Sequence, residues 1–370
     1  MTVVFFISGH GFGHASREVE IINALIAAAP SLRVLIRTAV SPSLMARTLR
    51  VPYTLRPGAC DSGIVQSSSV AHDDAATIEQ AAEFYSTFDA RVADETRQLA
   101  NHDVTLIVGD IPPLAFEVAA RLGVPSIAIG NFTWDWIYET QPGFAAIDGL
   151  LPLIRTAYGK TTRALELPFA GGFEVFPRVE KLPLVARRPT RGRAETRAHF
   201  RVPPERPAAL LSFGGYGLPS LDLSSLDCLD RWTVVTTDRI TPVSSGGRPA
   251  DVVFLAEEAF LTGSFRYEDL VASCDVVLTK PGYGIIAECI ASATPILYTS
   301  RGTFREYDLL VEEMPKYLRC RFISQQDLFA GRWRDALDAL VTQGPPPETM
   351  AVNGAEVAAT KIVAALRLEA

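Results

Sequence analysis

The feature that most constrains the fold is an alternation, repeated along nearly the whole chain, of short apolar runs and longer segments with helical periodicity. Continuous apolar runs rich in β-branched residues indicate strands that are buried on both faces. Helices between such strands indicate parallel pairing, so the sequence predicts two open α/β sheets. The predicted strands are Val3–Ser8, Arg33–Arg37, Thr105–Gly109 and Ser126–Gly130 in the first half, and Ala208–Phe213, Thr233–Thr237, Val252–Ala256, Asp275–Thr279 and Ile296–Thr299 in the second.

A change in composition divides the chain between the two sets of strands. The 370 residues are enough for two domains with a core each. A stretch rich in Pro and Arg predicts an interdomain connection, with some structure of its own, over 177–206. The first domain is then expected over 1–176 and the second over 207–352. The segment 353–370 has helical periodicity and is expected to form a C-terminal helix that packs back on the first domain.

Composition excludes several classes of protein. A hydrophobic content of 48% excludes a disordered chain, and a net charge of −7 offers no basic face for nucleic acid. The five cysteines are scattered without a CxxC pair, which fits neither a zinc knuckle nor a disulfide framework and favours a reducing compartment. The apolar N-terminal run ends at Ser8, too early for a signal peptide or a membrane span. We therefore expect a cytoplasmic protein without a membrane-spanning segment.

A Gly-rich turn, Ser8–His14, lies between the first predicted strand and a helical run over Ser16–Ala28. Its glycines allow a ligand to approach the backbone, and the N–H groups at the helix start favour an anion. The GxGxG spacing differs from the dinucleotide-binding pattern, and the strand that ends near Arg37 supplies no acid for a ribose. A histidine titrates near neutrality, so His14 can act as a general base. Both His14 and His10 can instead simply pack or hydrogen-bond in the turn.

Two further Gly-rich turns follow predicted strands of the second domain, at Ser212–Gly217 and Lys280–Gly284. The second of them opens a helix, and Glu288 in the first turns of that helix can accept hydrogen bonds from a pair of ribose hydroxyls. Each glycine also suits any tight α/β turn, and Glu288 can equally lie on a solvated helix face. Three such turns over two domains nevertheless predict a cleft with a ligand-binding turn on each side.

The second half of the chain resembles the donor domain of the GT-B superfamily of nucleotide-sugar glycosyltransferases. The resemblance rests on Tyr267–Glu288, with CDVVLTKPGYG inside it, and on Thr294–Leu297 and Phe304–Tyr307. GHGFGH at the start together with the late KPGYG is similar to bacterial glycosyltransferase-like proteins and to the N-terminal domain of plant arabinokinases, whose GHMP kinase half has no counterpart here. The resemblance implies two Rossmann-like, doubly wound domains facing across a cleft, the first for the acceptor and the second for the donor.

The resemblance assigns catalysis to two residues of the first domain. His14 matches the histidine that deprotonates the acceptor hydroxyl in inverting members, and Asp110 matches the aspartate that orients this histidine. Asp110 follows an apolar strand and can alternatively cap a helix before Pro112.

The donor-binding residues implied by the resemblance lie in the second domain and in the connection before it. They are Gly214, Gly215, Lys280, Gly282, Tyr283, Gly284, Glu288, Arg305, Glu306 and Arg187. Glu288 matches the ribose-binding glutamate, the glycines match turns that approach the diphosphate, and Arg187 resembles a diphosphate-contacting arginine. Arg305 and Glu306 match the pair that contacts the donor sugar, but no glutamine stands there, so the sugar is not implied.

Acceptor contacts are expected from the first turn and from an aromatic cluster after a strand end. The residues are Gly11, Phe12, Gly13, Phe132, Trp134 and Trp136. Aromatic walls suit sugars, polyketides or nucleosides alike, and such a cluster can equally be ordinary core.

The sequence contains no DxD motif and no cluster at metal-ligand spacing, so we expect no metal and no cofactor besides a UDP- or dTDP-sugar co-substrate. Turn N–H groups and helix N-termini can stabilise the leaving diphosphate. His14 would take the acceptor proton while Asp110 holds its tautomer. The alternatives are a GT-B epimerase or hydrolase that consumes donor without acceptor, a non-catalytic sugar-nucleotide-binding protein, and an NADP-dependent enzyme that uses Arg37.

Overall fold

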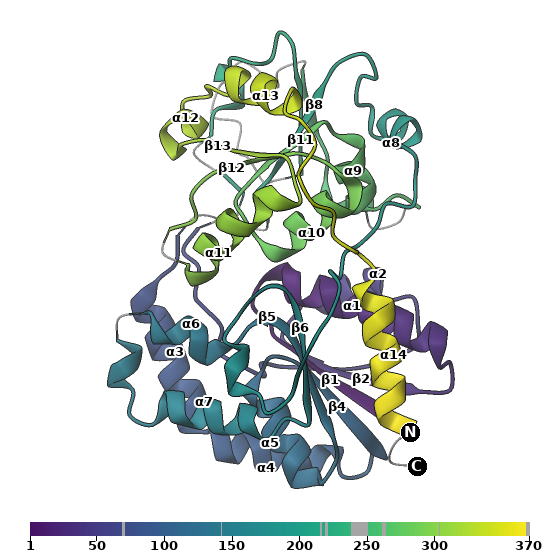
Figure 1. Ribbon diagram of the computed structural model, residues 1–370, viewed down its shortest axis with the longest axis vertical. Coiled ribbons are helices and arrows are strands. Elements are labelled where there is room, and N and C mark those ends of the chain that lie inside the picture. The colour runs from purple at the N-terminus through teal and green to yellow at the C-terminus, as the bar shows by residue number, and fades with distance from the viewer. Residues whose placement is uncertain are drawn as a thin grey trace. The chain divides into compact units, whose positions relative to one another are not determined.

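Two compact units, each built on one sheet, make up the computed structural model (Figure 1). The structure describes residues 1–68, 71–141, 143–214, 217–218, 221–237, 251–260, 264–302 and 304–367. Unit 1 comprises Met1–Val65, Asp73–Ala186 and Ala351–Ala370, and unit 2 comprises Gln66–His72 and Arg187–Met350. Within these described ranges, all strand pairs in both sheets are parallel. The predicted fold class, two parallel α/β sheets, is confirmed.

The sheet of unit 1 has seven strands in the order β3-β2-β1-β4-β5-β6-β7. Their bounds are β1 Thr2–Ile7, β2 Arg33–Thr38, β3 Thr54–Pro57, β4 Val104–Asp110, β5 Ser126–Phe132, β6 Arg163–Gly171 and β7 Val179–Lys181. Ile7 of β1 pairs with Asp110 of β4, so the carboxyl ends of these two strands lie level with each other. This register places the turn after β1 beside the last residue of β4.

Helices cover both faces of this sheet (Figure 1). They are α1 Gly11–Ala28, α2 Pro42–Thr48, α3 Asp74–Ser86, α4 Phe88–Leu99, α5 Pro113–Leu122, α6 Trp134–Glu139, α7 Leu150–Gly159 and α14 Gly354–Arg367, with single 3-10 turns η1 Phe144–Ala146 and η2 Phe173–Val175. Gly11, the first residue of α1, has a φ of +72°, in the left-handed region where glycine is favoured. The strand-to-helix turn therefore depends on glycine at this position.

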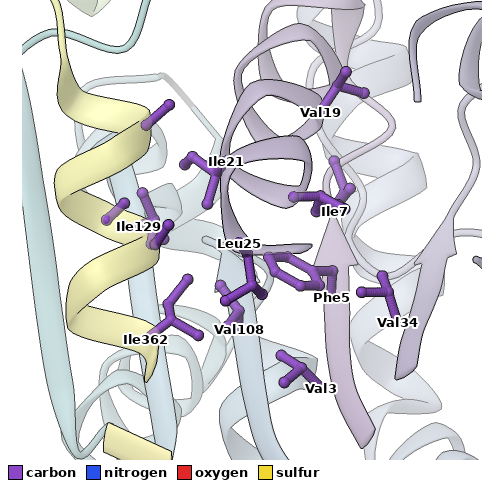
Figure 2. Packing of buried hydrophobic residues seen from close by; sticks show 14 of the residues in the cluster. Val3, Phe5, Ile7, Val19, Ile21, Leu25, Val34, Val108, Ile129 and Ile362 are labelled. Carbon is purple, nitrogen blue, oxygen red and sulfur yellow. The ribbon is translucent and has the colours of Figure 1, made fainter. Parts of the chain in front are cut away.

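The C-terminal helix α14 belongs to unit 1 and lies beside α1 (Figures 1 and 2). Ile362 of α14 joins Ile21 and Leu25 of α1 in one buried cluster over Phe5 of β1. The start of the helix is tied down by the backbone, since the N–H of Gly354 donates to the carbonyl of Leu184 at 3.0 Å. The chain thus returns from unit 2 to complete the core of unit 1.

Replacing Gly354 with Ala is expected to destabilise unit 1. A Cβ at Gly354 would overlap the carbonyl oxygen of Pro183 and lie 2.8 Å from the carbonyl carbon of Leu184, and these are backbone atoms that cannot move aside cheaply. We expect a loss of about 1–3 kcal/mol in the free energy of unfolding, measured in urea. Gly344→Ala is the matched control, because a Cβ there meets nothing within 4 Å. Equal effects of the two substitutions would contradict the tight docking of α14.

The sheet of unit 2 has six strands in the order β10-β9-β8-β11-β12-β13. Its elements are β8 Ala208–Ser212, β9 Thr233–Thr236, β10 Val252–Phe254, β11 Val276–Thr279, β12 Ile296–Tyr298, β13 Cys320–Phe322, α8 Arg193–Phe200, α9 Tyr267–Ser273, α10 Tyr283–Ser292, α11 Arg305–Glu313, α12 Gln325–Phe329 and α13 Arg334–Val341, with 3-10 turns η4 Leu223–Ser225, η5 Glu257–Phe260 and η6 Met314–Lys316. Trp232 and Trp333 are fully buried in its core.

The segment expected to connect the domains, 177–206, is divided between the units. It contributes β7 to the sheet of unit 1 and α8 to unit 2, and unit 2 begins at Arg187. The segment Gln66–His72, inside the expected first domain, belongs to unit 2, where the ring of His72 contacts Phe304 with centroids 4.7 Å apart. Division by composition alone therefore misses chain segments that cross between units.

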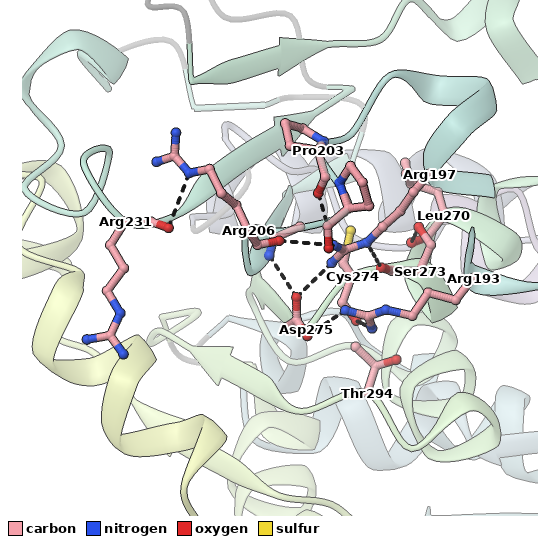
Figure 3. A network of polar contacts seen from close by, with 12 residues as sticks. Arg193, Arg197, Pro203, Arg206, Arg231, Leu270, Ser273, Cys274, Asp275 and Thr294 are labelled. Atoms are coloured by element: carbon pink, nitrogen blue, oxygen red, sulfur yellow. Dashed lines mark hydrogen bonds and ion pairs between the residues drawn. The ribbon is translucent and has the colours of Figure 1, made fainter. Parts of the chain in front are cut away.

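A buried arginine fixes α8 to the rest of unit 2 (Figure 3). Arg197 pairs with Asp275 at 2.7 Å and donates to the carbonyl oxygens of Ser273 at 2.8 Å and Pro203 at 3.1 Å. Asp275 also accepts from the backbone N–H of Ala208 at 2.8 Å. The network joins α8, the start of β8 and the start of β11. Over the described ranges, no helix has the length and apolar character needed to cross a bilayer.

Candidate active site

His14 and Asp110, the two residues predicted to catalyse, are brought together in unit 1. Asp110 is the last residue of β4, and His14 lies in the first turn of α1, which follows β1 directly. Because β1 and β4 are paired and parallel, the two side chains meet at the carboxyl edge of the sheet. Nδ1 of His14 lies 3.1 Å from Oδ1 of Asp110, and both side chains are buried. The geometry is that of a histidine oriented by a carboxylate.

Arg17, which the sequence analysis missed, joins this pair. Its Nη2 donates to Oδ1 of Asp110 at 2.5 Å and lies 3.2 Å from Nδ1 of His14. Its Nη1 donates to the side-chain oxygen of Asn131, at the end of β5. Positions three apart on a helix are neighbours, so the spacing of His14 and Arg17 was a signal that could have found it. The site is therefore a triad of histidine, aspartate and arginine.

Burial and charge act in opposite directions on the acids of this site. Burial would raise the pKa of Asp110, but the charges and hydrogen bonds of Arg17 and His14 outweigh it and lower the pKa. Glu18, on the same helix, is fully buried, and burial together with the charge of Asp110 raises its pKa well above the usual range. The two acids are therefore shifted in opposite directions, Asp110 toward the ionised form and Glu18 toward the neutral form.

An aromatic wall backs His14. Phe132 lies edge-on to the His14 ring at 5.5 Å between centroids, and Trp134 lies at 6.5 Å. Trp134 is 0% exposed, and its indole N–H donates to Asp61 at 2.9 Å. Burial raises the pKa of Asp61, while hydrogen bonds from Ser8 and Trp134 and the charge of His14 oppose this rise.

Two of the predicted acceptor contacts, Phe132 and Trp134, form this wall. Phe132 and Trp134 are buried and lie in ring contact with His14 and with each other. Trp136 is half-buried and packs over Gly171 and Gly172. Of the predicted contacts in the first turn, Gly11 and Gly13 lie in the first turn of α1 near His14, while the side chain of Phe12 lies outside the described structure.

The predicted donor-binding turns of unit 2 follow β8 and β11. Gly214 has a φ of +71°, which explains glycine there, whereas Gly215 lies outside the described residues. Gly282 is the N-cap of α10 with an extended backbone, and a Cβ on it would meet nothing within 4 Å. Neither backbone strain nor packing requires glycine at 282, which leaves room for a ligand there. Lys280, Tyr283 and Gly284 belong to the same turn and the first residues of α10.

Two residues predicted to bind different parts of a donor are paired with each other. Nε of Arg187 donates to Oε1 of Glu288 at 2.8 Å, and Nη1 of Arg187 lies 3.5 Å from Glu268. Glu288 is buried, so the alternative that it lies on a solvated helix face is wrong. Sequence reasoning missed Glu268, which lies in the first turn of α9. The Glu288 carboxylate is thus fixed in place by Arg187.

Arg301 connects the predicted sugar-contacting pair to the turn after β11. Arg305 and Glu306 are the first two residues of α11, and Glu306 is buried. Nη1 of Arg301 lies 3.3 Å from Oε1 of Glu306 and 3.5 Å from the carbonyl oxygen of Pro281. Its guanidinium also lies over the ring of Phe304, 4.0 Å from the centroid. Sequence reasoning missed Arg301, although it stands between the strand β12 and the start of α11.

In the part of the chain that the structure describes, there is no group of three or more His, Cys, Asp or Glu residues that could hold a metal ion.

Comparisons with known proteins found a relative of similar sequence and solved structures with the same fold. No family model matches the chain. The chain is 27% identical over 365 residues to L-arabinokinase of Arabidopsis thaliana, a match that covers 97% of this chain and 34% of the arabinokinase. The chain therefore spans about a third of the length of that relative.

Two solved structures show the fold. The glycosyltransferase VinC in complex with dTDP has a TM-score of 0.58 at 17% identity, covering 99% of this chain and 95% of that chain. The UDP-glucose: anthocyanidin 3-O-glucosyltransferase in complex with UDP has a TM-score of 0.59 at 13% identity, covering 99% of both chains. The chain has the fold of the GT-B nucleotide-sugar glycosyltransferases.

Proposed function

We propose that the protein is a metal-independent, inverting glycosyltransferase that moves a sugar from a UDP- or dTDP-sugar to a hydroxyl acceptor. The observation that carries the proposal is the contact between His14 and Asp110 at the carboxyl edge of the sheet of unit 1. A carboxylate that accepts a hydrogen bond from Nδ1–H leaves the lone pair on Nε2, which is the form of histidine that can act as a base.

In the proposed reaction, Nε2 of His14 takes the proton of the acceptor hydroxyl as its oxygen attacks the anomeric carbon of the donor sugar. The bond between that carbon and the diphosphate oxygen breaks, and the nucleoside diphosphate leaves with the bonding electrons. Attack from the face opposite the leaving group inverts the anomeric centre. The pKa of Asp110 is below its usual range, so it stays ionised and stabilises the imidazolium that forms.

We propose that unit 2 holds the donor. The open N-terminus of α10 at Gly282 offers N–H groups to the diphosphate, and Lys280 and Arg305 add positive charge. Glu288, fixed by Arg187, is the proposed partner of the ribose hydroxyls. The UDP and dTDP in the two similar structures support these two bases for the donor. We also propose a cytoplasmic location, which the five free cysteines support.

Binding of the nucleotide is the first test of this proposal. UDP or dTDP is expected to raise the midpoint of thermal unfolding, since a ligand at a hundredfold excess over Kd stabilises by about 2.7 kcal/mol. GDP is the control nucleotide. Glu288→Gln is expected to weaken UDP binding more than dTDP binding, because dTDP lacks one of the two hydroxyls that the carboxylate would accept from. Equal loss with both nucleotides would contradict the ribose role of Glu288.

Turnover is the second test. The protein is incubated with a panel of UDP- and dTDP-sugars, with and without hydroxyl acceptors, and release of nucleoside diphosphate is measured. We expect release that depends on the acceptor, with a product of inverted anomeric configuration. Donor consumed equally without acceptor would indicate a hydrolase or epimerase, and nucleotide binding without any turnover across the panel would contradict a transferase.

A further inference from the structure

Three polar atoms meet at one point of the unit 1 site. Nδ1 of His14, Oδ1 of Asp110 and Nη2 of Arg17 lie 3.1, 2.5 and 3.2 Å apart pairwise. One imidazole nitrogen therefore faces a carboxylate and a guanidinium at the same time. The carboxylate and the guanidinium therefore compete for this nitrogen, whereas in a pair of histidine and aspartate only the carboxylate would contact it.

The competition allows two arrangements of the imidazole proton. In the first, Nδ1–H donates to Asp110, Arg17 donates to the same oxygen, and the lone pair is on Nε2. In the second, Arg17 donates to Nδ1, the proton is on Nε2, and two acceptor atoms face each other 3.1 Å apart. The charge of Asp110 favours the first arrangement, because facing lone pairs repel.

Arg17 also affects protonation of the ring. A positive charge 3.2 Å from Nδ1 opposes a second positive charge on the imidazole. Arg17 moreover shares the carboxylate that would otherwise stabilise the imidazolium alone. Its position is fixed at both ends, by Asp110 and by Asn131, whose side-chain amide donates to the carbonyl oxygen of Pro168 at 2.6 Å.

The other titratable groups that face His14 do not supply a positive charge in the place of Arg17. Glu18 comes from the same helix, and burial together with the charge of Asp110 raises its pKa. Asp61, from the segment after β3, interacts with the charged form of His14. The ring centroid of His10 lies 6.4 Å from that of His14. Among the residues that the structure describes here, Arg17 is the cation that contacts both members of the pair.

We propose that Arg17 is a positioning residue that opposes protonation of His14 and, together with Asp110, keeps the lone pair on Nε2. The inference rests on the proposed function for its role in catalysis, but its effect on the proton of His14 exists in the free protein. The Asp110 carboxylate in turn prevents Arg17 from capturing Nδ1.

The test is nuclear magnetic resonance of the protein labelled with ¹⁵N in its histidines, with His14 assigned by its loss in His14→Gln. The unsubstituted protein is expected to show the Nδ1–H tautomer. In Arg17→Met the midpoint of the His14 titration is expected to rise by about one pH unit or more, because a nearby positive charge is lost. Arg17→Lys, which keeps the charge, is the matched control and should titrate close to the unsubstituted protein.

Two further variants keep the test decisive. Arg17→Gln can still donate to Asp110 and should fold where Arg17→Met does not, and it is expected to show the same rise. Asp110→Asn is expected to shift the ring to the Nε2–H tautomer, because Arg17 then donates to Nδ1. An unmoved midpoint in Arg17→Gln, or the Nδ1–H tautomer retained in Asp110→Asn, would overturn the proposal.

Activity gives the second readout. The acid limb of log kcat/KM against pH should move to higher pH in Arg17→Gln by the same amount as the resonance, with activity recovered in alkaline buffer. A purely structural role would lower activity equally at every pH. The resonance is measured without turnover, so the two proposals can fail separately. If the resonance shifts but no sugar is transferred, only the proposed function is refuted. If sugar is transferred but the acid limb does not move in Arg17→Gln, only the role of Arg17 is refuted.

Discussion

Replacing His14 with Ala is expected to lower kcat for sugar transfer by about 10²–10⁴-fold, which is the usual contribution of a general base. The substitution removes the ring nitrogen that takes the acceptor proton, while the groups proposed to hold the nucleotide lie in unit 2 and keep their contacts. The dissociation constant for UDP or dTDP should therefore change little. Steady-state kinetics gives kcat, and titration calorimetry gives the nucleotide affinity.

His10→Ala is the matched control for this prediction. His10 belongs to the same Gly-rich turn, but its Nδ1 accepts from the backbone N–H of Ile64 at 3.3 Å, so a packing role accounts for it. We expect its loss to change kcat far less than the loss of His14. Unchanged turnover in His14→Ala would remove His14 from the mechanism, and a larger effect from His10 would move the base to that residue.

How much of the fold could be predicted depended on how each strand is buried. The central strands β1 and β4 were predicted because both of their faces are buried and their sequences are continuously apolar. β6 was missed because its buried residues alternate with partly exposed ones. β7 and β13 have three residues each and lie at sheet edges, where exposure removes the apolar signal.

The candidate site was predictable where it depends on strand ends and not where it depends on side-chain direction. His14 and Asp110 both follow apolar strands, and parallel pairing brings such positions to one edge. Arg17 was missed although it follows His14 by three residues on the same helix, because this spacing places it beside His14 but does not show that its side chain reaches Asp110 at the end of β4. Trp134 stays a predicted acceptor contact, and its sequence position did not show that its ring is buried with its N–H donating to Asp61.

The largest effect on stability is expected at Arg197, whose side chain is 4% exposed. Arg197→Met keeps much of the apolar volume but removes the donors for Ser273 and Pro203 and one partner of Asp275 (Figure 3). Asp275 keeps Arg193 as a partner, so the cost comes from the carbonyl oxygens of Ser273 and Pro203, which lose their donor; this costs about 1–3 kcal/mol for each buried group left unsatisfied. The loss in the free energy of unfolding is measured in urea. An unchanged slope of this free energy against urea concentration shows that the variant and the unsubstituted protein unfold in the same transition.

Arg193→Met is the matched control, because Arg193 pairs with the same carboxylate at 2.6 Å but is 46% exposed. An exposed ion pair contributes at most about 1 kcal/mol, so this variant should remain close to the unsubstituted protein. Similar losses from both substitutions would show that burial of Arg197 does not decide its contribution to stability.

Asp275 directly precedes β11, and the turn after β11 contains Lys280 and Gly282. Loss of Arg197 should therefore also weaken nucleotide binding near the unfolding midpoint, whereas binding at low temperature should be preserved because the turn itself is intact.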